Sequence, residues 1–206
     1  MNPSELTPEL LIDAYVSGVF PMGSEDGIEW YSPDPRGIIP LDAFHIPHGL
    51  QRALKKQRFE VRFNTSFREV MQACAERPET WITEPILETY CTLHHHGLAH
   101  SVEAWREDSL VGGLYGVALR GAFFGESMFH RETDASKIAL VGLVHHLQAR
   151  HFVLLDTQWT TPHLETFGAC AIPKARYLKL LTRALATETD FRMPANPDNH
   201  GISSSV

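Results

Sequence analysis

The sequence predicts an α+β fold with a mixed central sheet and a small lobe at the N-terminus. One observation is the order of the patterns, in which helices come first, then an antiparallel hairpin, then strand, helix, strand and helix. A second is that residues 1–43 carry little apolar sequence for a core of their own. The end of the chain is rich in Asn, Pro and Ser. We therefore divide the chain into a lobe (1–43), a main domain (44–190) and a disordered tail (191–206).

Composition and charge exclude several classes of protein. A chain of 206 residues that is 43% hydrophobic suits one compact domain with a small appendage. No run of roughly eighteen apolar residues could span a bilayer, and the first residues do not read as a secretory signal. The three cysteines lie far apart, which argues against disulfides and a zinc site and suits a reducing cytosol. A net charge of −7 argues against a nucleic-acid partner unless cations gather on one face.

The first helix is predicted to begin at Thr7. Thr7 is a good N-cap, Pro8 suits the first helical position, and Gly18 suits the end. Residues 20–37 are predicted to form a loop, because proline and glycine recur there and two prolines two residues apart exclude a regular helix.

A dense basic run follows in residues 51–62, QRALKKQRFEVR. Against one carboxylate it holds five cations: Arg52, Lys55, Lys56, Arg58 and Arg62. A run of this kind is usually a solvated helix face. Its contrast with the acidic remainder of the chain also makes it a candidate contact for a polyanion.

Two further helices are predicted before the hairpin. Ser66 and Glu69 can form a capping box for a helix that ends near Arg77, and Thr83 begins another. Three consecutive histidines, 94–96, close the second helix. Consecutive residues do not share a helix face, so we predict no metal site there.

The strands come next. Ser101–Trp105 and Leu110–Leu119 flank a polar turn, which predicts a hairpin, and glycines in the second strand indicate a bulge or a close backbone approach. Gly121–Phe124 supplies a third strand. The remaining elements are a helix at 135–150 capped by Asp134 or Thr133, a strand at 152–155, and helices at 162–167 and 174–187.

This order of elements is the one expected of acyltransferases of the GNAT type. GNAT enzymes that use acetyl-CoA hold its pyrophosphate in a glycine-rich loop at the start of the helix after the strand. Here the corresponding residues, 130–136, contain two carboxylates and lack glycine. Transfer from CoA is therefore disfavoured, although a small-molecule N-acyltransferase stays open as an alternative.

The stretch GAFFGESMFHRETDASK, residues 121–137, contains an unusual carboxylate. After an apolar start the chain is predicted to turn on Gly125, and Glu126 then lies among phenylalanine and methionine. A charge in such a setting must be paired or neutralised if it is buried, so Glu126 is a candidate functional residue. The alternative is a strand-end side chain that points to solvent.

Several motifs in this order resemble the leucyl/phenylalanyl-tRNA–protein transferase family. They are WYSPDPRG (30–37), TWIT (80–83), HSVEAWRED with LVGGLYGVA (100–118), FGESMF (124–129), ASK (135–137), LLDTQ (154–158) and GACAIPKARYL (168–178). The resemblance covers about residues 6–181. It implies a cytoplasmic enzyme with a GNAT-like catalytic domain that transfers Leu or Phe, with Met as a further candidate, from aminoacyl-tRNA to an N-terminal Arg or Lys, marking the protein for degradation. Many members carry about thirty more residues before the first helix.

The resemblance also assigns roles to residues. Asp156 and Gln158 are the implied catalytic pair, with Gln158 orienting a substrate and Asp156 polarising it or accepting a proton; without the resemblance, Asp156 could equally cap a helix. Trp30 or Tyr31, with Trp81, resemble the aromatics that hold the terminal adenosine, or else they pack between domains. The implied aminoacyl pocket, which is otherwise plain core, comprises Leu114, Phe123, Gly125, Ser127, Met128, Leu140, Leu143 and Leu155.

The chemistry of such a transfer needs few parts. An aminoacyl ester is already activated, so we predict no cofactor, and alignment of the two substrates can contribute about 7–11 kcal/mol. We predict that Glu126 binds the acceptor, because the acceptor's N-terminal Arg or Lys brings a cation next to the reacting amine. The basic run would contact tRNA phosphates. A non-catalytic RNA- or peptide-binding relative is the other alternative, and it would need a broken Asp156/Gln158 pair.

Overall fold

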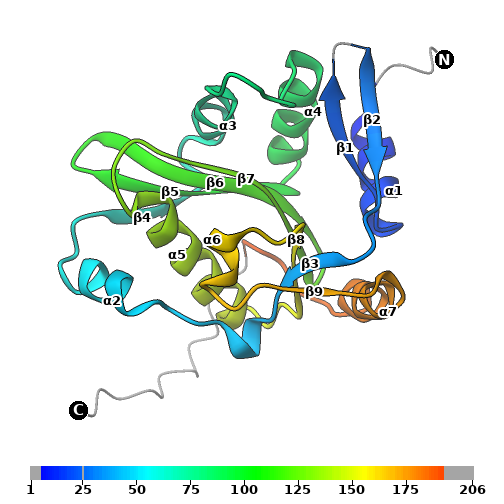
Figure 1. Ribbon diagram of the computed structural model, residues 1–206. Helices are drawn as coiled ribbons and strands as arrows, with labels where there is room; N and C mark the ends of the chain where they lie inside the picture. The colour runs from blue at the N-terminus through cyan, green and yellow to red at the C-terminus, as the bar shows by residue number, and fades with distance from the viewer. Residues whose placement is uncertain (1–5, 25, 193–206) are drawn as a thin grey trace.

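A seven-stranded mixed sheet is the centre of the computed structural model, which describes residues 6–24 and 26–192 (Figure 1). The β7–β8 pair is parallel and the other pairs in this sheet are antiparallel. In spatial order the strands are β4 (Glu60–Phe63), β5 (Ala99–Arg106), β6 (Ser109–Leu119), β7 (Ala122–His130), β8 (Leu154–Gln158), β3 (Arg36–Ile39) and β9 (Cys170–Ile172). The predicted α+β class with a mixed sheet is confirmed.

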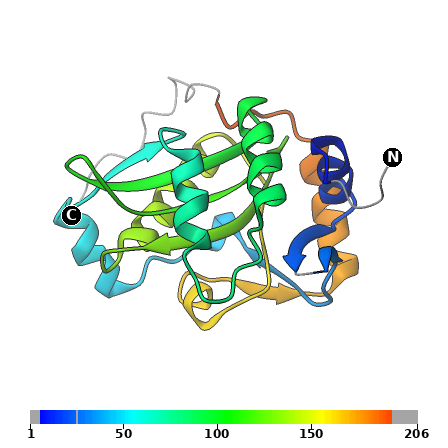
Figure 2. The same ribbon diagram turned by 90° about the horizontal axis from the view of Figure 1, so that it is seen from above.

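Helices cover both faces of this sheet, as Figures 1 and 2 show. Phe123 and Phe124 of β7 belong to different core clusters because successive side chains of a strand point to opposite faces. Phe124 packs with α3 and α4, and Phe123 with α5. The helices are α1 (Pro8–Val16), α2 (His48–Lys55), α3 (Phe67–Ala75), α4 (Glu84–His95), α5 (Ala135–Ala149), α6 (Pro162–Glu165) and α7 (Lys174–Leu185), with a 3-10 turn at Leu41–Ala43.

The N-terminal segment differs from its prediction after the first helix. Helix α1 begins as expected, with the Thr7 hydroxyl accepting a hydrogen bond from the Leu10 N–H at 3.2 Å. The predicted loop at 20–37 is wrong, because it contains a hairpin of β1 (Phe20–Ser24) and β2 (Gly27–Tyr31) and then strand β3. Proline excludes a helix interior but is tolerated at the edge of a small sheet.

Strand β3, from the N-terminal part of the chain, pairs with two strands from its C-terminal part. It lies in the large sheet between β8 and β9, so that sheet takes a strand from residues 1–43, which we assigned to the N-terminal lobe. At the opposite end, Phe191 is buried and stacks on His100 with ring centroids 4.1 Å apart. The rest of the predicted tail, 193–206, lies outside the described residues. The division into domains stays a prediction.

Two of the predicted side-chain caps, those at Ser66 and Asp134, do not form. Ser66 occupies the N-cap position of α3 without a side-chain cap, since buried Glu103 of β5 accepts from the N–H groups of Thr65 and Ser66 at 3.0 and 3.1 Å. Asp134 precedes α5 but pairs with the Lys137 ammonium at 2.8 Å instead of capping the helix.

The predicted turn at Gly125 is also wrong, since β7 continues from Ala122 to His130. Register shifts here: Tyr115 of β6 lies opposite Ser127, while the next residue, Gly116, lies opposite Gly125. Glu126 is therefore the extra residue of a β-bulge, a feature that re-aims a side chain. A Cβ on Gly116 would lie 2.2 Å from the Phe124 carbonyl oxygen, so glycine is required at this close approach.

None of the helices in the described ranges combines the length and the apolar character needed to cross a bilayer.

Candidate active site

A cavity of about 430 Å³ opens beside the Glu126 bulge and has two contrasting ends. Five leucines line one end: Leu114, Leu140, Leu143, Leu155 and Leu164. The aromatic side chains Phe20, Trp81 and Trp159 line another part of the wall. Glu126 and Gln158 are among the polar residues of the lining, and the Gln158 side-chain amide donates to Glu126 at 3.0 Å. The cavity is therefore suited to receive an apolar side chain next to a small number of hydrogen-bonding groups.

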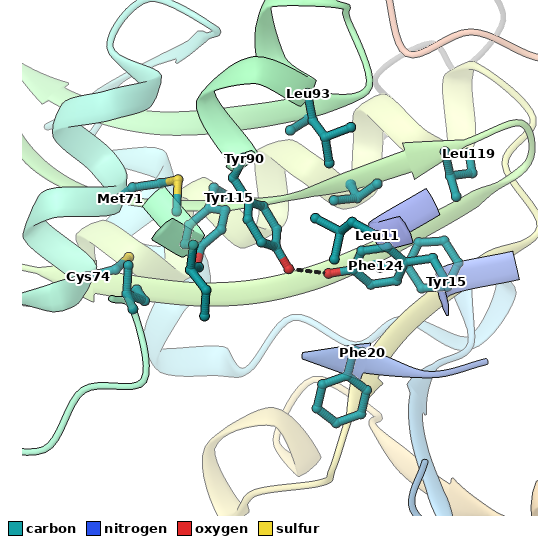
Figure 3. Packing of buried hydrophobic residues seen from close by; sticks show 14 of the residues in the cluster. Leu11, Tyr15, Phe20, Met71, Cys74, Tyr90, Leu93, Tyr115, Leu119 and Phe124 are labelled. Atoms are coloured by element: carbon teal, nitrogen blue, oxygen red, sulfur yellow. Dashed lines mark hydrogen bonds between the residues drawn. The ribbon is translucent and has the colours of Figure 1, made fainter. Parts of the chain in front are cut away.

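The carboxylate of Glu126 is the centre of a hydrogen-bond network. It accepts from the hydroxyls of Tyr15 at 2.7 Å and Tyr90 at 3.3 Å, and from the Gln158 side-chain amide at 3.0 Å. The two tyrosines come from α1 and α4 and meet at 2.5 Å between their hydroxyl oxygens (Figure 3). Burial raises the pKa of Glu126 to about 7, and the hydrogen bond from Tyr15 opposes that shift. Glu126 can therefore change charge near neutral pH.

Asp156 lies behind the cavity wall and is fully buried. Its two oxygens accept from Arg36 at 2.9 and 2.7 Å, from the Tyr177 hydroxyl at 2.7 Å and from the backbone N–H of Gln158 at 2.9 Å. The Arg36 guanidinium in turn lies 4.8 and 4.6 Å from the ring centroids of Phe20 and Tyr177. The carboxylate is thus held by groups from three separate parts of the chain.

The backbone of Gln158 has an uncommon conformation. Its φ of 58° is in the left-handed region, which costs a residue other than glycine about 1–3 kcal/mol. The Asp156 carboxylate stabilises this conformation by accepting from the Gln158 N–H. Gly37 of β3 approaches so closely that a Cβ there would lie 2.4 Å from the Trp159 carbonyl carbon. In this setting the Gln158 side-chain amide donates to Glu126 at 3.0 Å.

A model of the leucyl/phenylalanyl-tRNA protein transferase family matches residues 38–182, and a model of its N-terminal domain matches residues 4–34. The chain belongs to this family. Three curated leucyl/phenylalanyl-tRNA–protein transferases illustrate the similarity. The one from Herpetosiphon aurantiacus is 57% identical over 90% of this chain and 98% of its own length. Those from Akkermansia muciniphila and Salinibacter ruber are 61% and 53% identical, over 87% and 92% of this chain and 96% and 84% of their own lengths.

Most of the side chains that the family resemblance assigns to the aminoacyl pocket lie together in the cavity. They are Leu114, Gly125, Ser127, Met128, Leu140, Leu143 and Leu155. Phe123 does not line it, because this residue is fully buried on the α5 face and stacks on Phe191 at a centroid distance of 5.5 Å. Phe123 is therefore a core residue, and its part in the aminoacyl pocket stays a prediction.

Of the three aromatic residues predicted to hold the terminal adenosine, only one lines the cavity. Trp81 lines the cavity, but Trp30 and Tyr31 do not. Trp30 is 40% exposed on β2, and Tyr31 packs edge-on to Trp159 with centroids 6.1 Å apart. Phe20 and Trp159, which the sequence analysis did not single out, line the cavity.

The basic run lies away from the cavity. Arg52 and Lys55 are on α2, Lys56 and Arg58 follow it, and Arg62 is on β4. None of the five lines the cavity, and four of them are exposed. Arg62 is partly covered and lies over the Trp105 ring at 4.7 Å.

Sequence reasoning missed Arg36, Tyr15, Tyr90 and Tyr177 as parts of the network around Asp156 and Glu126. Arg36 stands in the WYSPDPRG motif, which was a usable signal. The tyrosines lie on helices α1, α4 and α7 and carry no local signal that separates them from ordinary core residues.

Proposed function

We propose that this chain transfers Leu or Phe from aminoacyl-tRNA to the N-terminal Arg or Lys of acceptor proteins in the cytoplasm, as a step that marks them for degradation. The observation that carries the proposal is the cavity itself, in which an apolar pocket adjoins Glu126 and Gln158. The family membership supports the reaction class, and the mixed sheet is compatible with a GNAT-like domain. Met is a third donor to be tested.

In this proposal the apolar end of the cavity receives the side chain of the donor. Its five leucines and Met128 suit Leu or Phe, since burying such a side chain gains about 1.5–3 kcal/mol. The aromatic wall, with Trp81 at its edge, would receive the terminal adenosine. Both assignments put the ester between the two ends, next to the polar groups.

The reaction joins the acceptor's α-amine to the carbonyl carbon of the ester, and the bond from that carbon to the ribose oxygen breaks. The amine loses a proton and the ribose oxygen gains one, so no cofactor is consumed. Glu126 holds the cationic acceptor, Gln158 orients the reactants, and Asp156 fixes the backbone of Gln158 from behind. We therefore describe Asp156 as a positioning residue.

One experiment tests the transfer directly. The protein is incubated with tRNA charged with Leu, Phe or Met and with peptides that begin with Arg, Lys or Ala, and the products are read by mass spectrometry. We expect one Leu or Phe to be added to the Arg- and Lys-starting peptides only. Acetylation from acetyl-CoA instead would favour a small-molecule acyltransferase, and no transfer at all would favour a non-catalytic relative.

Replacing Trp81 with alanine should raise the KM for a leucyl-adenosine donor about tenfold, because base–aromatic stacking contributes about 1–3 kcal/mol. Trp30→Ala is the matched control, since Trp30 lies outside the cavity and should leave this KM nearly unchanged. A loss as large in the Trp30 variant would contradict the assignment of the aromatic wall.

Lys55→Glu combined with Lys56→Glu should raise the KM for leucyl-tRNA and make it less sensitive to salt, through loss of phosphate contacts and counterion release. Both side chains are exposed and lie outside the cavity, so turnover of leucyl-adenosine should not change. Steady-state kinetics with both donors at several salt concentrations measure this. An equal loss with both donors would speak against a tRNA contact here.

A further inference from the structure

A second cavity, of about 580 Å³, adjoins the first. The two share Arg77, Met128 and His163 in their walls. The second cavity lies where the end of α3, the end of β7 and the start of α5 meet. We call it the Arg77 groove. Unlike the leucine-lined end of the first cavity, it presents several charged side chains.

Arg77 stands at the junction of the two cavities with its charge unneutralised. Its Nη2 atom donates to the Ser127 hydroxyl at 3.1 Å and to the Met128 carbonyl oxygen at 2.5 Å, which are both neutral acceptors. Within residues 6–24 and 26–192, it forms no ion pair with a carboxylate. A guanidinium with further N–H donors at a cavity mouth suits a phosphate oxygen.

Two more cations line the Arg77 groove further from the junction. Arg131 pairs with Glu76 at 3.2 Å, and Lys137 pairs with Asp134 at 2.8 Å. Both cations are partly exposed, at 44% and 38% of their side-chain surface. Exposed ion pairs of this kind contribute little to stability, so an incoming anion can replace the carboxylate at little cost.

The groove also leads toward the basic run. Glu132, the neighbour of Arg131, lies 3.6 Å from Arg58 of that run and 2.9 Å from Arg106. In the other direction, Trp81 follows Arg77 by four residues on the α3–α4 connection, and both line the first cavity. Arg77, Arg131 and Lys137 thus place cations from the first cavity along the groove, and Glu132, next to Arg131, pairs with Arg58 of the basic run.

We propose that the Arg77 groove receives the two phosphodiester groups that precede the terminal adenosine of the donor tRNA, with Arg77 contacting the first of them. This inference rests on the proposed function. Charge favours a nucleic-acid strand over an acceptor polypeptide, because the groove supplies cations along a path that joins the aromatic wall to the basic run. A polypeptide has no charge that recurs along its backbone.

The test compares two donors, leucyl-adenosine and leucyl-CpCpA, of which the second adds these two phosphodiester groups and the two cytidines that they join. The quantity measured is the ratio of their kcat/KM values, because damage to the shared part of the site affects both donors. Arg77→Gln should lower the ratio of leucyl-CpCpA to leucyl-adenosine about tenfold, as expected for one charge-assisted contact. Arg131→Gln with Lys137→Gln should lower it as well.

Arg68→Gln is the matched control. Arg68 lies on α3, the helix that ends two residues before Arg77, but it pairs with Glu88 at 2.6 Å and lines neither cavity, so the ratio should stay at the wild-type value. Raising the salt concentration should lower the wild-type ratio more than that of Arg77→Gln.

An unchanged ratio in Arg77→Gln would overturn the proposal. So would a rise in KM that appears only with longer acceptor peptides, because the groove would then hold the acceptor polypeptide. If the wild-type protein transfers Leu from both donors and Arg77→Gln leaves the ratio unchanged, the groove assignment is wrong but the proposed function stands. If the wild-type protein transfers Leu neither from these two donors nor from leucyl-tRNA, the proposed function fails and the groove assignment fails with it.

Discussion

Replacing Asp156 with alanine is expected to lower the free energy of unfolding by about 3–5 kcal/mol, because the substitution leaves the buried guanidinium of Arg36 without its partner. Turnover should fall about a hundredfold as well, since the backbone of Gln158 loses the acceptor that holds it at a φ of 58°. Urea unfolding measures the first effect. Single-turnover kinetics with leucyl-tRNA and an Arg-starting peptide measure the second.

A double variant separates these two effects. Arg36→Leu with Asp156→Leu removes both charges, and replacing a buried ion pair with apolar residues is often close to neutral for stability. We expect this variant to recover most of the lost stability but not the lost turnover, because Gln158 still lacks its acceptor. If Asp156→Ala turns over at nearly the wild-type rate, the Gln158 backbone does not depend on this carboxylate.

Glu126→Gln is expected to lower kcat/KM for Arg- and Lys-starting peptides about ten- to hundredfold. A charge-assisted hydrogen bond to the acceptor would contribute about 1.5–3 kcal/mol, and the amide keeps the shape without the charge. Affinity for a non-reactive donor analogue should hardly change. Unchanged acceptor kinetics, or a loss confined to donor binding, would place Glu126 on the donor side of the cavity.

The same substitution should alter the dependence of stability on pH. The pKa of Glu126 is raised from 4.5 to about 7 in the folded protein, so folding favours the protonated form. Its contribution to stability is complete below pH 4.5 and is lost as pH rises to about 7, a decline of about 3 kcal/mol. Urea unfolding across this range should show the decline in the wild type and its absence in Glu126→Gln.

Glu188→Gln is the control for this pH series, because the Glu188 side chain is 90% exposed and should leave the decline intact. A wild-type protein whose stability stays flat between pH 4.5 and 7 would mean that Glu126 titrates near its usual range. If the Glu126→Gln variant still shows the full decline in the free energy of unfolding, a group other than Glu126 causes that decline.

Local chemistry made several elements predictable. Thr7 and Pro8 fix the start of α1 through an N-cap and a first-turn proline, and the polar turn after Trp105 predicts the β5–β6 hairpin. The close backbone approach predicted for the glycines of β6 is confirmed at Gly116, where a Cβ would meet the Phe124 carbonyl oxygen. Each of these depends only on residues near one another in the chain.

Contacts between distant residues were beyond a local reading of the sequence. A proline at residue 21 excludes a helix but leaves loop and edge strand equally open, which is why the β1–β2 hairpin was missed. Strand geometry predicts that Phe123 and Phe124 point to opposite faces of the sheet, but it does not tell which face lines the cavity. It also does not predict the strand register that makes Glu126 the extra residue of a bulge. Tyr15 and Tyr90 meet Glu126 only because three elements pack together.

The insertion of β3 between β8 and β9 has a consequence for the order of folding during synthesis. Arg36 and Asp156 are 120 residues apart, so the arginine leaves the ribosome long before its carboxylate partner exists. At a synthesis rate of about 5–20 residues per second, the gap lasts roughly 6–24 s. Throughout that interval Ile38 and Ile39 cannot be buried between their final neighbours. The central sheet is therefore completed only when the carboxyl-terminal strands emerge, and the nascent chain depends on chaperones or on its own solubility until then.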